Sequence, residues 1–187
     1  MKARGDQVSA TRERIAAAMA ELHEDVGPRH TTIKAIAERA GVERLTVYRH
    51  FPDERAMFQA CSAHWAAQHP LPDPSTWSTT SDPFERSRRA LDAIYAYFDE
   101  NAKLLRQVHR DLAEMPALAE VTAPFLNYLR GLADELAGGF AKGARERIRP
   151  TLRFLLRFET WDCLHAEVPD HGRQVALAVR WIEASAT

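Results

Sequence analysis

Apolar residues in this chain recur at intervals of three and four positions, and nowhere do they alternate convincingly as they would along a β-strand. The pattern is clear near the N-terminus, where Ile15, Ala18, Met19 and Leu22 would lie on one face of a helix. Such spacing predicts amphipathic helices, because the 3.6-residue period brings these positions together. We therefore predict an all-α fold, and 187 residues suffice for one or two small domains with a buried core.

Two short helical segments, residues 33–40 and 44–50, are joined by a tight turn that begins at Gly41. Thr31 offers a hydroxyl to cap the first segment, and Gly41 suits the left-handed backbone that ends it. This spacing is typical of a DNA-binding helix-turn-helix. Between residues 28 and 50, five basic residues stand against two acidic ones, although the whole chain has a net charge of -1. The local excess of positive charge favours contacts with phosphates.

A stretch over residues 68–81 is rich in proline, serine and threonine, lacks periodicity and reads as a linker. We place a helix-turn-helix domain at residues 9–66, whose fourth helix continues as a connector, and a second helical domain at residues 82–185. Asp82 as N-cap, with a proline next to it and a glutamate three residues later, marks the start of the second domain. Further helices are predicted over residues 103–111, 116–139, 149–166 and 170–184.

The helix-turn-helix segment carries a series of motifs in a fixed order: Thr31-Thr32-Ile33, Ile36-Ala37, Ala40-Gly41-Val42 and Thr46-Val47-Tyr48-Arg49-His50-Phe51-Pro52. In this order they resemble the DNA-binding domain of the tetracycline-repressor (TetR) family of transcriptional regulators. The resemblance covers about Thr11 to Trp65. It implies an N-terminal three-helix DNA reader, a C-terminal ligand-binding and dimerisation domain, and repression relieved by a small molecule.

The resemblance also implies that residues 44–50 form the recognition helix. An arginine can fork onto guanine, a threonine methyl can contact a thymine methyl, and a tyrosine hydroxyl can donate to a phosphate. Leu45 is open to two readings, a base contact or a core residue. Glu43, Leu45 and Glu54 depart from the serine, small residue and lysine usual in the family, and Arg55 offers a replacement cation beside Glu54. The expected DNA-contacting residues are Thr32, Lys34, Arg44, Leu45, Thr46, Tyr48, Arg49 and His50.

The C-terminal half combines large apolar side chains with a few polar tips, which suits a mostly apolar or aromatic ligand. The candidate pocket residues are Phe98, Arg106, His109, Phe125, Tyr128, Phe158 and Trp161. At helical spacing such side chains are more often plain core. The apolar residues of the last two predicted helices either close the protein's own core or form a four-helix contact with a second copy: Leu152, Leu155, Leu156, Val175, Ala178, Val179 and Ile182.

Signals for other classes of protein are weak. His109-Arg110-Asp111-Leu112 begins like a protein-kinase catalytic loop, but no glycine-rich phosphate loop accompanies it. The histidines and the two cysteines lack metal-ligand spacing, and no apolar run approaches 18 residues. We expect no catalytic, metal or cofactor site, a cytoplasmic location, and operator DNA, a small-molecule effector and a second copy as partners. A helical adaptor without DNA binding and a small helical enzyme are the alternatives.

Overall fold

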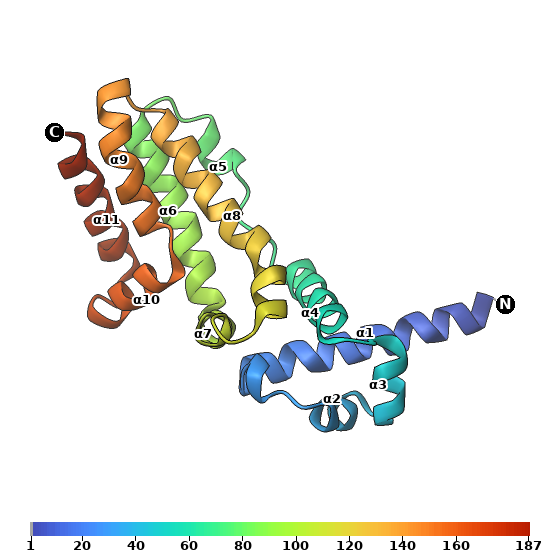
Figure 1. The fold of residues 1–187 in the computed structure, drawn as a ribbon. Helices are drawn as coiled ribbons and strands as arrows, with labels where there is room; N and C mark the ends of the chain where they lie inside the picture. The colour runs from blue at the N-terminus through green and yellow to red at the C-terminus, as the bar shows by residue number, and fades with distance from the viewer. Residues whose placement is uncertain (1) are drawn as a thin grey trace. The chain divides into compact units, whose positions relative to one another are not determined.

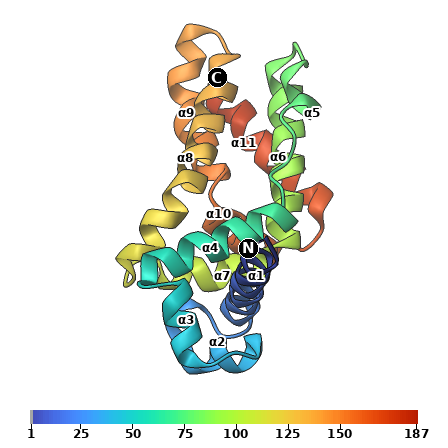
Figure 2. The same cartoon turned by 90° about the vertical axis from the view of Figure 1, so that its right-hand side faces the viewer.

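The computed structural model describes residues 2–187, with side chains from Gly5 onward (Figures 1 and 2). All its regular elements are helical, which confirms the predicted all-α fold. None of the helices in residues 2–187 has an apolar stretch long enough to span a membrane. In chain order the elements are α1 (Lys2–Asp25), η1 (Pro28–His30), α2 (Ile33–Ala40), α3 (Arg44–His50), α4 (Glu54–Gln68), α5 (Ser75–Ser78), α6 (Pro83–Glu100), α7 (Ala102–Asp111), α8 (Pro116–Gly138), α9 (Lys142–Leu155), α10 (Phe158–Glu167) and α11 (His171–Ala186).

The chain divides into two compact units. Unit 1 combines residues 1–70 with residues 103–123, and unit 2 combines residues 71–102 with residues 124–187. Most of α7 and the start of α8 thus belong with the N-terminal helices, whereas the sequence-based division assigns them to the C-terminal domain. The sequence pattern could not show this, because it locates the linker but not the later segment that packs back onto unit 1.

The core of unit 1 is built from α1, α2, α3 and α4. Helix α1 packs against both α2 and α4, and α2 packs against α3. Ile15 and Met19 of α1 belong to one buried apolar cluster with Ile36 of α2, Val47 of α3 and Cys61 of α4. Burial of these side chains, at roughly 1.5–3 kcal/mol each, is what holds two helices as short as α2 and α3 in place.

The ends of α2 are set by local contacts. Thr32, not Thr31, is its N-cap, and the Thr32 hydroxyl accepts a hydrogen bond from the Ala35 backbone N–H at 3.2 Å. The Thr31 hydroxyl instead donates to the Gly27 carbonyl at 2.9 Å. Gly41 ends the helix with φ 64° and ψ 43°, as predicted from its place in the sequence.

A buried carboxylate joins α7 to the turn after α1 within unit 1. Asp111 is 2% exposed. It accepts hydrogen bonds from the Arg29 backbone N–H at 3.1 Å and from the Arg110 guanidinium at 2.8 and 3.1 Å. Burial opposes ionisation of Asp111, but these donors outweigh it and hold the carboxyl pKa below its ordinary value. The Arg29 side chain adds an ion pair with Glu114.

A buried histidine links α1 to α4. The Nδ1 atom of His23 lies 3.2 Å from the Cys61 sulfur, and its ring packs against Phe58 with a centroid separation of 5.6 Å. Burial lowers the pKa of His23 to about 4, despite the opposing negative charge of Asp111, and burial raises the pKa of the Cys61 thiol to about 12. Both groups are therefore neutral at physiological pH.

In unit 2, α11 packs against both α6 and α9 (Figure 1). Helix α6 starts as predicted, with the Asp82 carboxylate accepting from the Glu85 backbone N–H at 2.9 Å. The helix expected over residues 149–166 is in fact two, because the chain breaks at Leu156 and Arg157. The break lets α10 turn Phe158 into the core while α9 keeps its own apolar face inward.

Candidate functional site

Helix α3 is held by its buried side and by one long-range contact. Val47 and Phe51 are fully buried. Arg12 of α1 donates to the His50 carbonyl at 2.6 Å, and its guanidinium lies 4.3 Å from the centre of the Phe51 ring. Arg12 therefore fixes the C-terminal end of α3. Sequence reasoning missed this residue, and no local motif singles out its partner 38 positions away.

The opposite face of α3 is open to solvent. Leu45 is 55% exposed and Tyr48 is 52% exposed, so the structure does not place Leu45 in the core. Arg44 and Arg49 are exposed on the same helix. Among the residues whose side chains the structure describes, no carboxylate lies within ion-pair distance of either arginine. The helix thus presents two uncompensated guanidinium groups beside a large aliphatic and a large aromatic side chain.

The neighbouring candidate contacts also leave donors available. The Thr32 hydroxyl accepts from the Ala35 backbone and keeps its own proton free to donate. Lys34 is exposed and lies 3.7 Å from Glu38, a surface ion pair that contributes little to stability. His50, at the end of α3, is half-buried.

Two nearby arginines already form ion pairs with carboxylates. Arg39 pairs with Glu21 at 2.9 Å and with Asp25 at 3.5 Å. Arg55, considered as a substitute for the missing lysine, pairs with Glu120 at 2.6 Å. Glu43 precedes α3 without capping it through its side chain.

Comparison with protein families identifies this part of the chain. Residues 15–61, which run from α1 into α4, match the family model described as bacterial regulatory proteins, tetR family. The segment is a tetR-family domain. The resemblance drawn from the sequence motifs is thus confirmed, and the tetR-family domain contains the whole helix-turn-helix described above.

Solved structures show the same fold over nearly the whole chain. A transcriptional regulator from Rhodococcus sp. Rha1 is 20% identical, with 91% of this chain and 95% of that chain covered and a TM-score of 0.64. A regulator described as tetR-family from Mesorhizobium loti is 17% identical, with 95% and 96% covered and a TM-score of 0.64. NalD, the secondary repressor of the MexAB-OprM multidrug efflux pump in Pseudomonas aeruginosa, is 18% identical, with 96% of both chains covered and a TM-score of 0.60. No curated protein matches the sequence.

The candidate pocket residues are divided between the two units. Arg106 and His109 lie in unit 1, and the other five lie in unit 2. Phe98, Phe158 and Trp161 form a buried aromatic cluster with centroid separations of 5.5–5.9 Å, and each is at most 2% exposed. The sealed cluster supports the reading of these three as core. The ring centroids of Phe125 and Tyr97 lie 6.1 Å apart. The Tyr128 hydroxyl is buried without a hydrogen-bond partner.

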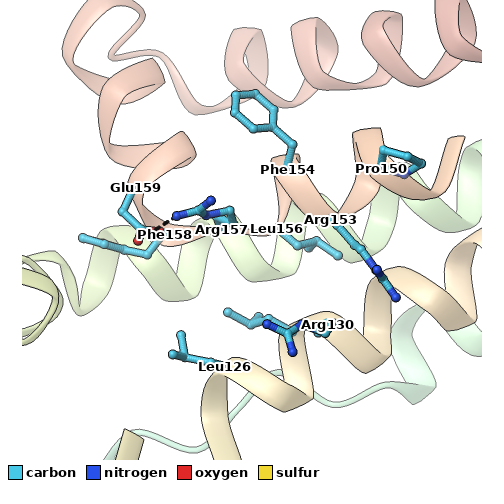
Figure 3. Close-up of a pocket in the computed structure, with 10 residues that line it drawn as sticks. Leu126, Arg130, Pro150, Arg153, Phe154, Leu156, Arg157, Phe158 and Glu159 are labelled. Carbon is cyan, nitrogen blue, oxygen red and sulfur yellow. Dashed lines mark hydrogen bonds and ion pairs between the residues drawn. The ribbon is translucent and has the colours of Figure 1, made fainter. Parts of the chain in front are cut away.

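An open cleft of about 840 Å³ lies elsewhere in unit 2, between α8, the end of α9 and the start of α10 (Figure 3). Of the predicted pocket residues, only Phe158 lines it. Its arginines were missed because no spacing along the sequence brings α8 and α9 together. The lining residues combine leucines and aromatic side chains with three arginines: Leu126, Leu129, Arg130, Pro150, Arg153, Phe154, Leu156, Arg157, Phe158 and Glu159.

The expected dimer residues belong to the protein's own core. Six of them are buried within unit 2, namely Leu152, Leu155, Leu156, Val175, Ala178 and Ile182, and Val179 is half-buried. These six side chains pack within one protomer, and a dimer interface formed by the predicted set stays a prediction. The same helices instead expose Phe154 at 53% and Trp181 at 38%, whose rings lie 6.5 Å apart.

Proposed function

We propose that this protein is a transcriptional repressor that binds a palindromic operator as a homodimer and is released by a small molecule. The observation that carries the proposal is the solvent face of α3. Arg44 and Arg49 flank the half-exposed Leu45 and Tyr48 there, and over residues 5–187 no carboxylate lies within ion-pair distance of either arginine. This surface contributes little to the stability of the unit, but it supplies what a major groove requires. The tetR-family domain at residues 15–61 supports the same function.

Each side chain of this surface has a chemical role in the proposal. Arg44 and Arg49 fork onto the O6 and N7 atoms of guanine. Leu45 and the Thr46 methyl group contact thymine methyl groups. The hydroxyls of Thr32 and Tyr48 donate to phosphate oxygens, as do Lys34 and His50. The last four position the helix on the duplex, whereas the first four read its sequence.

A homodimer places two such helices in successive major grooves, roughly 34–36 Å apart. The exposed Phe154 and Trp181 are our candidates for the centre of the dimer interface, in place of the buried residues expected from the sequence. Aromatic side chains exposed beside one another are typical of interface cores. An effector releases the operator when it binds more tightly to a conformer in which the spacing of the two recognition helices is altered. A tenfold loss of operator affinity requires that the effector's binding free energy differ by about 1.4 kcal/mol between the two conformers.

Fluorescence anisotropy with DNA from upstream of the protein's own gene tests the proposal. We expect roughly a thousandfold preference over scrambled DNA, and an affinity that falls steeply with salt. Where the upstream DNA shows no preference, random-site selection supplies the operator. Failure of that selection as well would contradict the proposal and favour the adaptor.

Three variants test the assignment of the surface. Arg49→Ala removes a base-reading fork and should weaken operator binding by roughly 5- to 150-fold, which corresponds to about 1–3 kcal/mol. Tyr48→Phe removes one phosphate donor and should weaken binding by roughly 2- to 10-fold. Arg39→Ala is the matched control, because Arg39 is engaged with carboxylates of α1 and should leave affinity unchanged. Circular dichroism verifies that each variant is folded. Equal affinities for all three would refute the assignment.

A further inference from the structure

The cleft between α8, α9 and α10 has the size of a small-molecule site. Its volume of about 840 Å³ falls within the roughly 300–1,000 Å³ typical of ligand pockets. It exists because the helix predicted over residues 149–166 is interrupted at Leu156 and Arg157, so that α10 leaves the line of α9. Figure 3 shows Leu126 and Arg130 of α8 on one side of the cleft and residues around this interruption on the other, with the Phe154 ring turned away from α8.

The edge of the cleft carries an excess of positive charge. Arg130, Arg153 and Arg157 line it, and Glu159 is the one carboxylate among the lining residues. Arg157 pairs with Glu159 at 3.2 Å. Arg153 bonds to Asp134, just outside the cleft, at 3.1 and 2.9 Å.

Arg130 stands apart from these pairs. Over residues 5–187 no carboxylate lies within ion-pair distance of its guanidinium. In Figure 3 the Arg153 side chain extends from α9 toward α8, the helix that carries Arg130. Asp134 also pairs with Arg149 at 3.6 Å and is close enough to feel the charge of Arg130. Three guanidinium groups thus share one exposed carboxylate, which favours the arrival of a further anion.

The floor of the cleft is apolar. Leu129, Leu156 and Phe158 line it and are at most 5% exposed, so each contributes a small apolar area, to which the half-buried Leu126 adds. A ligand complementary to this site needs an apolar body to cover the floor and a negative group at the edge. Guanidinium groups bind carboxylates through two parallel hydrogen bonds, which an alcohol or an amine cannot accept in the same way.

We propose that this cleft is the effector site and that it binds an amphipathic organic acid, a carboxylate attached to an aliphatic or aromatic body. The role of the acid as an effector rests on the proposed repressor function, whereas its binding in the cleft does not. The carboxylate lies against Arg130 and Arg153, and the apolar body covers Leu129, Leu156 and Phe158. The ligand thereby bridges α8 and α9, so its charge acts on the spacing of two helices of unit 2. This replaces the apolar or aromatic ligand expected from the sequence.

Isothermal titration calorimetry of the full-length protein with decanoate tests the ligand class. Methyl decanoate has nearly the same apolar body without the charge, and decyl phosphate has a different anionic head. We expect decanoate to bind at one site per chain, at least tenfold more tightly than its methyl ester, and more weakly as salt rises. Equal binding of acid and ester would overturn the proposal, and tighter binding of decyl phosphate would overturn the choice of a carboxylate.

Variants locate the site. Arg130→Ala and Arg153→Ala should each weaken decanoate binding at least tenfold, and Arg130→Lys should restore part of the loss. Arg180→Ala is the matched control, because Arg180 is an exposed arginine of α11 outside the cleft. Light scattering gives the oligomeric state of the same variants and tests whether a second copy of the chain covers the cleft. A change of oligomeric state in Arg130→Ala without a change in decanoate affinity would overturn the proposal in favour of a subunit contact.

Operator release is measured separately, by adding decanoate to the protein–DNA complex. Release that disappears in Arg130→Ala supports the effector role. Binding of decanoate without release overturns that role and leaves the organic-acid site standing. Absence of operator binding in the unliganded protein refutes the repressor function, while the calorimetry still decides the ligand class.

Discussion

Replacement of Asp111 by asparagine should destabilise unit 1, because the carboxylate is buried and accepts three hydrogen bonds. Asparagine has nearly the same shape but only one acceptor oxygen, so it cannot receive both N–H groups of the Arg110 guanidinium. Its amide N–H₂ would face one of those donors. Hydrogen bonds to charged groups contribute about 1.5–3 kcal/mol each. Arg110 is 49% exposed, which reduces its share, and we expect a total loss of about 1.5–3 kcal/mol.

Thermal unfolding followed by circular dichroism measures this loss. For a chain of this size each kcal/mol lowers Tm by roughly 2–4 °C, so Asp111→Asn should melt about 3–12 °C below the wild type at pH 7. Asp25→Asn is the control within the same unit, because Asp25 forms only exposed ion pairs with Lys103 and Arg39. Its melting temperature should not change resolvably.

The difference should also depend on pH in a defined direction. The pKa of Asp111 is lower in the folded protein than its ordinary value of 3.8, so its ionised form stabilises the fold above that value. The stabilisation is lost as pH falls through the lowered pKa. The gap between wild type and Asp111→Asn should therefore be constant from pH 7 to 5 and shrink below about pH 4. A gap under 1 °C at pH 7, or one that widens in acid, would refute the reasoning.

Three further predictions concern other features. Gly41→Ala places a side chain at φ 64° in open space, so only backbone strain acts, and urea unfolding should show a loss of roughly 1 kcal/mol; unchanged stability would argue against the left-handed turn. Burial lowers the pKa of His23 to about 4 from 6.5, so its NMR signals should stay constant from pH 8 to 5, and stability should decline as pH falls from about 6.5 to 4 because only the unfolded state then gains the proton. Titration of His23 near pH 6.5 would contradict its burial beside Cys61. Phe154→Glu puts a charge beside Trp181 at the proposed interface and should yield monomers in sedimentation equilibrium with operator binding lost; intact dimers would move the interface elsewhere.

Local signals predicted the parts of the fold that local contacts determine. The start of α6 follows from Asp82 and Glu85, since the aspartate accepts from a backbone N–H three residues later. The end of α2 follows from Gly41, since that backbone conformation strongly favours glycine. In both cases the interacting atoms lie within one turn of each other, so the sequence contains the whole cause.

The break between α9 and α10 has a cause that the sequence contains only indirectly. One straight helix through Leu152 and Leu156 would bring Glu159 and Cys163 onto the same inward face. The interruption moves both outward and buries Phe158 and its neighbours instead. No glycine or proline marks the position, so only the change of apolar register hinted at it.

The candidate sites also differ in whether local sequence or tertiary packing determines them. The residues of α3 lie within one short helix, and their order indicated its exposed face except at Leu45, where only the structure shows the side chain in solvent. Arg130 and Arg153 come from different helices, and Arg12 acts on a carbonyl far along the chain. Relations of this kind depend on tertiary packing, which periodicity does not describe.

The division of the chain into units has a consequence for recombination between regulators. The polypeptide passes from one unit to the other after residues 70, 102 and 123. A single crossover at the proline-rich segment would therefore transplant residues 1–70 without Asp111, which supplies an acceptor to the Arg29 backbone. A working chimera needs residues 103–123 from the same parent as residues 1–70. Exchange of unit 2 therefore replaces two segments, residues 71–102 and 124–187, and keeps residues 103–123 between them.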